Sequence, residues 1–208
     1  MKPILFNTDM VVAIMEGRKT VTRRLVKPQP GFFYDVGGRI PDPDNPDHIA
    51  FLAMDPNDHE EIRVPPYQPG DILYVRETWR VNSASNPPSR CTIGYKAGGD
   101  ATFDEIIALP TAKGEWKPSI HMPKEAARIF LRVKDVRVER LNNMQEEDAI
   151  AEGFPDLGVD ADSPLERFSV LWDKTISREL RDEFGWYANP WVWEIEFEKI
   201  SKEEAMTC

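Results

Sequence analysis

The side chains best suited to chemistry lie together in the stretch Gly17–Arg24. Four cationic side chains and two hydroxyls occur there, and no acidic residue interrupts the chain as far as Pro28. Cations this closely spaced repel one another unless an anionic or polar group lies among them. Because the chain as a whole is acidic, we expect a ligand-binding site at this stretch.

Three residues of the stretch are of the types found in hydrolytic sites. A lysine that is partly desolvated near other cations has a lowered pKa, so Lys19 could act as a base. A threonine hydroxyl becomes a nucleophile when such a base removes its proton, and this gives Thr22 a role. If the segment is extended, Thr20, Thr22 and Arg24 share one face, and Arg24 can bind a carbonyl or phosphate there. The alternative for Lys19 is an exposed surface lysine, and Arg23, on the opposite face, is expected at the surface.

Two acids are candidates for the partner of this base. Glu77 lies in a predicted strand near Arg76 and Trp79, where it could pair with an arginine or hold Lys19. Glu152 ends a short, acidic helical segment, and its surroundings in the sequence do not distinguish it. The residues expected to contact a substrate are Gly17, Thr20, Arg24, Arg76, Glu77 and Trp79. Trp79 is a candidate for stacking on a base, with core packing as the alternative.

Cysteine and histidine give no sign of a metal site. Cys91 and Cys208 are too few for a disulfide framework, which indicates a reducing, cytoplasmic setting. The three histidines lack metal-ligand spacing, so we expect neither metal nor cofactor. The chain also has no apolar run long enough to cross a bilayer, so we expect no membrane partner.

Charge is unevenly distributed along the 208 residues. The net charge is −10, and residues 139–208 alone carry 18 acids and 7 bases. Proteins that coat nucleic acids are usually basic, so this balance argues against duplex binding. A local basic site on an acidic chain fits a single nucleotide or a short RNA strand better.

The sequence patterns predict many short strands and few helices. Strands are expected at 2–6, 20–25, 72–78, 91–96, 127–141 and 191–200, and helices at 8–16, 145–152 and 163–176. Two irregular segments, at about 27–69 and 82–117, are predicted to be long loop insertions. The first contains nine prolines, and a hairpin near Phe32–Ile40 is an alternative within it. We therefore expect one α+β domain, a small and mostly antiparallel β-barrel with flanking helices.

The sequence resembles the ASCH domain family, whose members are PUA-like β-barrels linked to RNA. Gly17, Lys19 and Arg24 match the family's Gly-x-Lys-x-x-x-x-Arg signature. Three later segments resemble the family's strands in the right order, namely 70–75, 127–141 and 191–197. The resemblance implies a single ASCH domain over residues 1–208, with the two insertions as additions.

The sequence is also similar to the small bacterial ASCH enzymes that remove the acetyl group from acetylcytidine. The resemblance places their lysine and threonine at Lys19 and Thr22, and their essential glutamate at Glu152. It implies an amidohydrolase acting on a modified nucleoside. The chain also resembles prophage-encoded ASCH proteins of unassigned activity. A non-catalytic RNA-binding module and a ribonuclease stay open as alternatives, and the sequence does not determine an oligomeric state.

Overall fold

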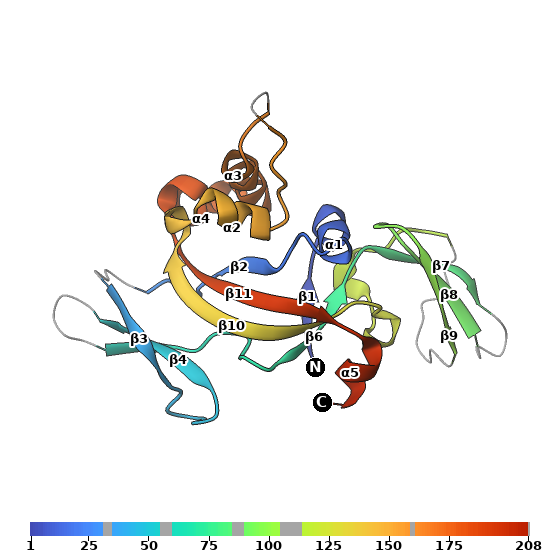
Figure 1. Ribbon diagram of the computed structural model, residues 1–208, viewed down its shortest axis with the longest axis horizontal. Coiled ribbons are helices and arrows are strands. Elements are labelled where there is room, and N and C mark those ends of the chain that lie inside the picture. Colours follow the sequence, from blue (N-terminus) through green and yellow to red (C-terminus); the bar gives the residue numbers. More distant parts are fainter. Residues whose placement is uncertain (31–34, 55–59, 85–89, 105–113, 159–160, 208) are drawn as a thin grey trace. The chain divides into compact units, whose positions relative to one another are not determined.

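A computed structural model describes residues 1–30, 35–54, 60–84, 90–104, 114–158 and 161–207. In this part of the chain, eleven strands and five helices form an α+β fold (Figure 1). The strands are β1 (Lys2–Leu5), β2 (Val21–Leu25), β3 (Asp35–Pro41), β4 (Ile49–Met54), β5 (Glu60–Arg63), β6 (Ile72–Arg76), β7 (Trp79–Ala84), β8 (Arg90–Tyr95), β9 (Asp100–Asp104), β10 (Phe130–Arg140) and β11 (Trp191–Ile200). The helices are α1 (Thr8–Met15), α2 (Glu146–Ala151), α3 (Pro164–Thr175), α4 (Arg181–Phe184) and α5 (Lys202–Thr207).

The strands form three sheets. The largest has the order β1-β6-β10-β11-β2, and the other two have the orders β3-β4-β5 and β7-β8-β9. Most pairs are antiparallel, and β1 with β6 is parallel. The mostly antiparallel α+β class is therefore confirmed, whereas a closed barrel stays a prediction.

The chain divides into two compact units. The first unit contains residues 1–17, 71–132 and 198–208, and the second contains 18–70 and 133–197. Both β10 and β11 pass from one unit into the other. The candidate residues Lys19, Thr22, Arg24 and Glu152 all belong to the second unit.

The second unit packs its helices on an apolar cluster. Phe168 and Trp172 of α3 share this cluster with Leu141, Ala149 and Val192. Ser163 caps α3 and accepts a hydrogen bond from the Glu166 amide, as the predicted start of this helix requires. In Figure 1, α2, α3 and α4 group together beside β2 and β11.

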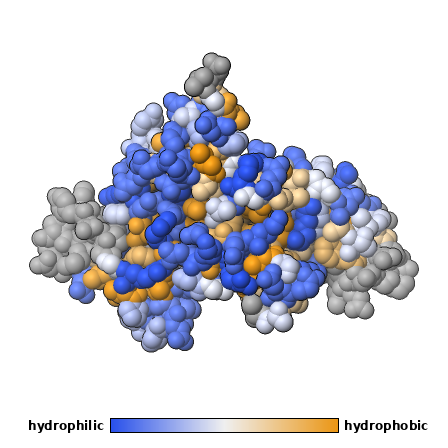
Figure 2. Space-filling model, in the orientation of Figure 1, coloured by the Kyte–Doolittle hydropathy of each residue, from blue (hydrophilic) through white to orange (hydrophobic). Residues whose placement is uncertain are grey.

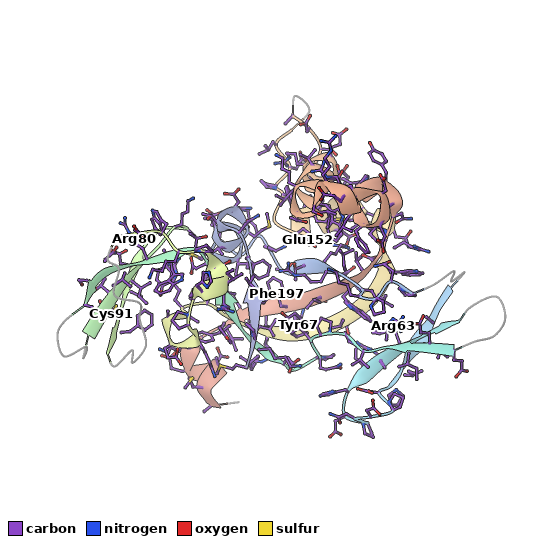
Figure 3. All side chains as sticks on the ribbon, turned by 180° about the vertical axis from the view of Figure 1, so that it is seen from behind. Arg63, Tyr67, Arg80, Cys91, Glu152 and Phe197 are labelled. Carbon is purple, nitrogen blue, oxygen red and sulfur yellow. The ribbon has the colours of Figure 1, made fainter. Side chains whose placement is uncertain are left out.

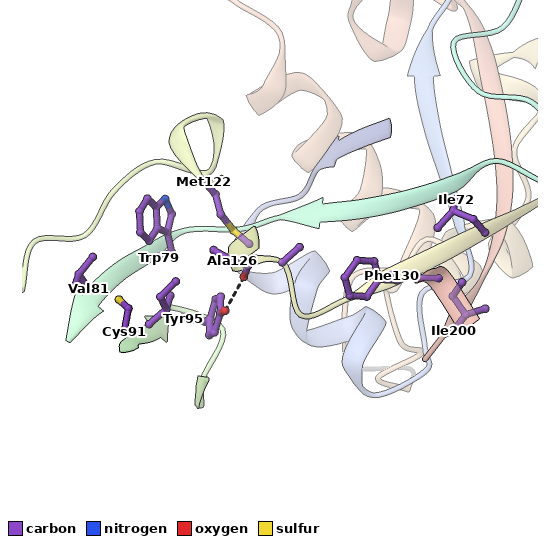
Figure 4. Close-up of a cluster of buried hydrophobic side chains, with 12 residues drawn as sticks. Ile72, Trp79, Val81, Cys91, Tyr95, Met122, Ala126, Phe130 and Ile200 are labelled. Carbon is purple, nitrogen blue, oxygen red and sulfur yellow. Dashed lines mark hydrogen bonds between the residues drawn. The ribbon is translucent and has the colours of Figure 1, made fainter. Parts of the chain in front are cut away.

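The first unit has its own apolar core, drawn in Figure 4. Trp79, Cys91, Tyr95 and Met122 are buried there, and the Tyr95 hydroxyl donates to the Ala126 carbonyl at 2.7 Å. Burial raises the pKa of both Cys91 and Tyr95, because an apolar environment disfavours the anion. Both groups are therefore neutral core residues.

The two segments predicted to be long loops, at about 27–69 and 82–117, contain paired strands instead. Strands β3, β4 and β5 pair within residues 27–69, and β8 and β9 pair with β7 in the second segment. The predicted strand at 91–96 is confirmed as β8. In β4, Ala50 and Ala53 are fully buried. The many prolines led to the prediction of a loop. In the described ranges, however, they lie at strand ends and in turns, where they do not remove hydrogen bonds between strands.

The surface view in Figure 2 shows mainly hydrophilic residues, with hydrophobic residues in separate patches. Within the described ranges, no helix is both long and apolar enough to span a membrane.

Candidate functional site

A glycine starts the turn that leads into the candidate site. Helix α1 ends with Glu16 as its cap, and Gly17 follows with a φ of 75°. A side chain is strained in this left-handed region, so the predicted role of Gly17 in the turn is confirmed. The chain then enters β2, which pairs with β11 through Thr22–Ile195 and Arg24–Trp193.

Lys19 and Glu152 form a buried ion pair. Lys19 Nζ donates to Glu152 Oε2, to the Glu152 carbonyl at 2.9 Å and to the Val21 carbonyl at 2.8 Å. The two residues are only 3% exposed. The interpretation of Lys19 as an exposed surface lysine is therefore wrong.

Helix α2 brings Glu152 to this position. The helix starts where the Gln145 amide donates to Asp148 Oδ2 at 2.8 Å, and it ends with Glu152 as its cap and Gly153 at a φ of 103°. The Thr20 amide donates to the Ala151 carbonyl at 2.9 Å, which fixes the end of α2 against the chain entering β2. Figure 3 shows Glu152 at the base of the helices, facing β2.

Burial lowers the pKa of the Lys19 ammonium below its ordinary value. Glu152 opposes this shift through its charge and its hydrogen bond, while Arg24 and Arg23 add to it. Desolvation disfavours the charged amine, which is the condition a lysine base needs.

The other predicted residues of the stretch take different positions. Thr22 is 4% exposed and follows Val21, whose carbonyl binds Lys19. Thr20 is exposed, and its backbone bonds both α2 and β11. Arg24 is half-buried, and burial lowers its pKa although the charge of Glu152 opposes the shift.

Arg23 does not lie at the surface as expected. It is 4% exposed, its Nε donates to Glu139 Oε1 at 2.8 Å, and its Nη2 donates to Glu194 Oε2 at 2.9 Å. Glu194 lies opposite Arg23 in the β2–β11 register. Neither acid was predicted from the sequence, because only the order β10-β11-β2 brings them beside Arg23.

The carboxyl group of Glu139 has a raised pKa. Burial raises its pKa to about 7, Glu194 pushes in the same direction through a hydrogen bond and its charge, and Arg23 opposes the shift. The site therefore contains a carboxyl group that changes charge near neutral pH.

Glu77 and Arg76 have other partners. Both carboxylate oxygens of Glu77 accept from Arg128, at 2.8 and 2.9 Å. Arg76 donates to the carbonyls of Ile120 and Met122. Of the two candidate acids, Glu152 is the one that contacts Lys19.

Trp79 is fully buried, so its ring is not available for stacking on a base. It packs in the core of the first unit, with the Lys117 ammonium 5.5 Å from its ring centre. Core packing, the alternative given for Trp79, is therefore the observed one. Burial of a large apolar ring stabilises the folded state, whereas exposure of the ring to water does not.

Among the residues that the structure describes, no cluster of three or more His, Cys, Asp and Glu side chains could hold a metal ion. Three comparisons with known proteins found no match, whether with family models, curated proteins or solved structures. The ASCH resemblance therefore stays a prediction, and the case for function rests on the site itself.

Proposed function

We propose that this protein is an amidohydrolase that removes an acyl group from a modified nucleoside such as acetylcytidine. The observation that carries the proposal is the buried contact between Lys19 Nζ and Glu152 Oε2. Its substrate class comes from the ASCH resemblance.

The Lys19–Glu152 pair supplies the proton transfer. Glu152 takes a proton from the ammonium along the existing hydrogen bond, and the neutral amine of Lys19 then acts as the base. The lowered pKa of Lys19 supports this direction of transfer. Later, the protonated pair returns a proton to the leaving amino group of the nucleoside.

Thr22 is the proposed nucleophile. Its backbone follows the Val21 carbonyl, which lies 2.8 Å from Lys19 Nζ. The hydroxyl oxygen attacks the acyl carbonyl, the bond to nitrogen breaks, and water hydrolyses the resulting ester. Arg24, on the same strand face, is positioned to stabilise the oxyanion of the tetrahedral intermediate.

Burial has two consequences for such a site. Exclusion of water strengthens every charge interaction within it. A substrate reaches Thr22 only after neighbouring residues move, since Lys19, Thr22 and Glu152 are each less than 5% exposed.

The test is release of free nucleoside from a panel of acylated nucleosides by the purified protein, followed by chromatography. We expect hydrolysis of acetylcytidine, retained activity in Thr22→Ser and loss in the isosteric Thr22→Val. Thr102→Val, at an exposed threonine of β9, is the matched control and should keep activity. The proposal fails if wild-type protein releases nothing from any member of the panel.

No observation favours the two alternatives of a non-catalytic RNA-binding module or a ribonuclease. The ring expected to stack on a base, Trp79, is fully buried. Binding of single-stranded RNA at low salt, without hydrolysis of any acylated nucleoside, would favour the binding module instead.

A further inference from the structure

Arg23 is a buried cation surrounded by four acids from three elements. Two are hydrogen-bonded to it, Glu139 of β10 and Glu194 of β11. Two more lie within ion-pair distance at 3.6 Å, Asp148 of α2 and Glu152 at the end of α2. The side chain of Arg23 is completely inaccessible to solvent.

The two hydrogen bonds fix the plane of the guanidinium group. Nε and Nη2 are held by Glu139 and Glu194, which leaves Nη1 directed at Glu152 Oε1. Both Nη1 and Oε1 are buried and lack a hydrogen-bond partner within the described ranges. Their charges therefore act on each other across 3.6 Å with little screening.

Glu152 consequently lies between two cations. Its Oε2 accepts from Lys19, and its Oε1 faces Arg23. The carboxyl group of Glu152 therefore cannot rotate without giving up one of the two cations.

We infer that Arg23 is a positioning residue, which orients the Glu152 carboxyl group so that Oε2 faces Lys19. The expected effect of Arg23 on hydrolysis rests on the proposed function. The expected effect of Arg23 on the Lys19–Glu152 pair is independent of that function. A purely structural arginine would serve only as the counter-ion of Glu139 and Glu194.

The charge of Arg23 also acts on Lys19 directly. Burial is the main cause of the lowered pKa of Lys19, and Arg23 contributes in the same direction as a nearby like charge. Removing Arg23 should therefore raise the pKa of Lys19 directly, whereas losing the contact with Glu152 should lower it. Comparing the effect of Glu152→Gln with and without Arg23 separates these two contributions.

The test measures the pKa of Lys19 by NMR in protein with ¹³C-labelled lysine side chains, with the signal assigned by its loss in Lys19→Arg. We expect Glu152→Gln to lower the pKa of Lys19 in the wild-type background and to change it much less in the Arg23→Gln background, a comparison in which the direct effect of the Arg23 charge cancels. The matched control is Arg137→Gln, which removes another cation bound to Glu194, one whose side chain is 61% exposed. In that background, Glu152→Gln should lower the pKa of Lys19 as it does in wild type. An equal effect of Glu152→Gln in the wild-type and Arg23→Gln backgrounds would overturn the inference, whether or not the protein hydrolyses any substrate.

A second variant covers the case in which Arg23→Gln does not fold. Arg23→Gln combined with Glu194→Gln removes one charge of each sign, and in this background Glu152→Gln should again have little effect on the pKa of Lys19. If wild type is active, Arg23→Lys should reduce kcat by about 10²-fold through misplacement of Glu152, with little change in KM. Full activity in a folded Arg23→Lys variant would contradict the need for the planar guanidinium.

Discussion

At the scale of single residues, the main feature is a cluster of buried charges. Lys19 and Arg23 face Glu152, and Glu139 and Glu194 compensate Arg23. The side chains of Lys19, Arg23, Glu152 and Glu194 are at most 5% exposed, so the stability of each of these ions depends on its partners. This dependence makes the site sensitive to any change that removes a single charge.

We expect Lys19→Met and Glu152→Gln to be strongly non-additive. Either change alone leaves a buried charge without its closest partner, at a cost of about 3–5 kcal/mol in the free energy of unfolding. The double variant should cost less than the sum by at least about 1 kcal/mol. Urea denaturation of the four proteins measures this coupling, and strict additivity would mean that the two side chains do not interact.

A second prediction concerns pH. Glu139 has a pKa of about 7 in the folded protein and an ordinary value of 4.5. The folded state thus binds more protons than the unfolded state between these values, and stability should fall as the pH rises from about 4.5 through 7. The variant Glu139→Gln removes this titration.

The measurement is the urea midpoint of both proteins between pH 5 and 8. We expect the wild type to lose stability relative to Glu139→Gln across this range. Parallel curves would show that Glu139 titrates normally.

At the scale of secondary structure, the end of α2 determines where Glu152 lies. Gly153 reverses the chain with a φ of 103°, and its carbonyl accepts from Arg18 Nη1 at 2.7 Å. The backbone bond from Thr20 to Ala151 joins the same helix end to the chain entering β2. The pair of Lys19 and Glu152 thus depends on two backbone features as well as on charge.

Replacing Gly153 by alanine tests this dependence. A Cβ at this φ is strained, so Gly153→Ala should lower the free energy of unfolding by about 1–2 kcal/mol. The control is Gly38→Ala in β3, where φ is not positive and an added Cβ meets nothing within 4 Å. Equal stabilities of the two variants in urea would contradict the proposed strain.

At the scale of the whole molecule, two cores share two strands. The first unit buries Cys91 and the second buries the ion-pair site. Because β10 and β11 each run without a break from one unit into the other, unfolding of one unit frays these strands in the other. We therefore expect the chain to unfold in a single transition.

Thiol labelling measures this cooperativity. In a Cys208→Ser variant, Cys91 is the only thiol, and at 4% exposure it should react only after the first unit unfolds. Its labelling should follow the same urea dependence as the circular dichroism signal of the whole chain. Labelling at clearly lower urea would mean that the first unit unfolds separately.

The sequence by itself determined the local features of this protein. Helix α1 with its glycine end, strand β2, the short helix α2 and strand β11 all follow from periodicity, capping residues and glycine, which act over a few neighbouring residues. The basic stretch around Lys19 was visible because its charges are consecutive.

Only the tertiary structure decided which groups meet. It paired Lys19 with Glu152 and Glu77 with Arg128, it buried Trp79, and it moved Arg23 from an expected surface position to the centre of four acids. These contacts join residues more than 50 positions apart in the chain, as with Glu77 and Arg128 at a separation of 51. The alternation of side chains along a strand predicts which of them share a face. Only the order of the strands in the sheet determines which face is buried and which charged side chains of neighbouring strands lie beside one another.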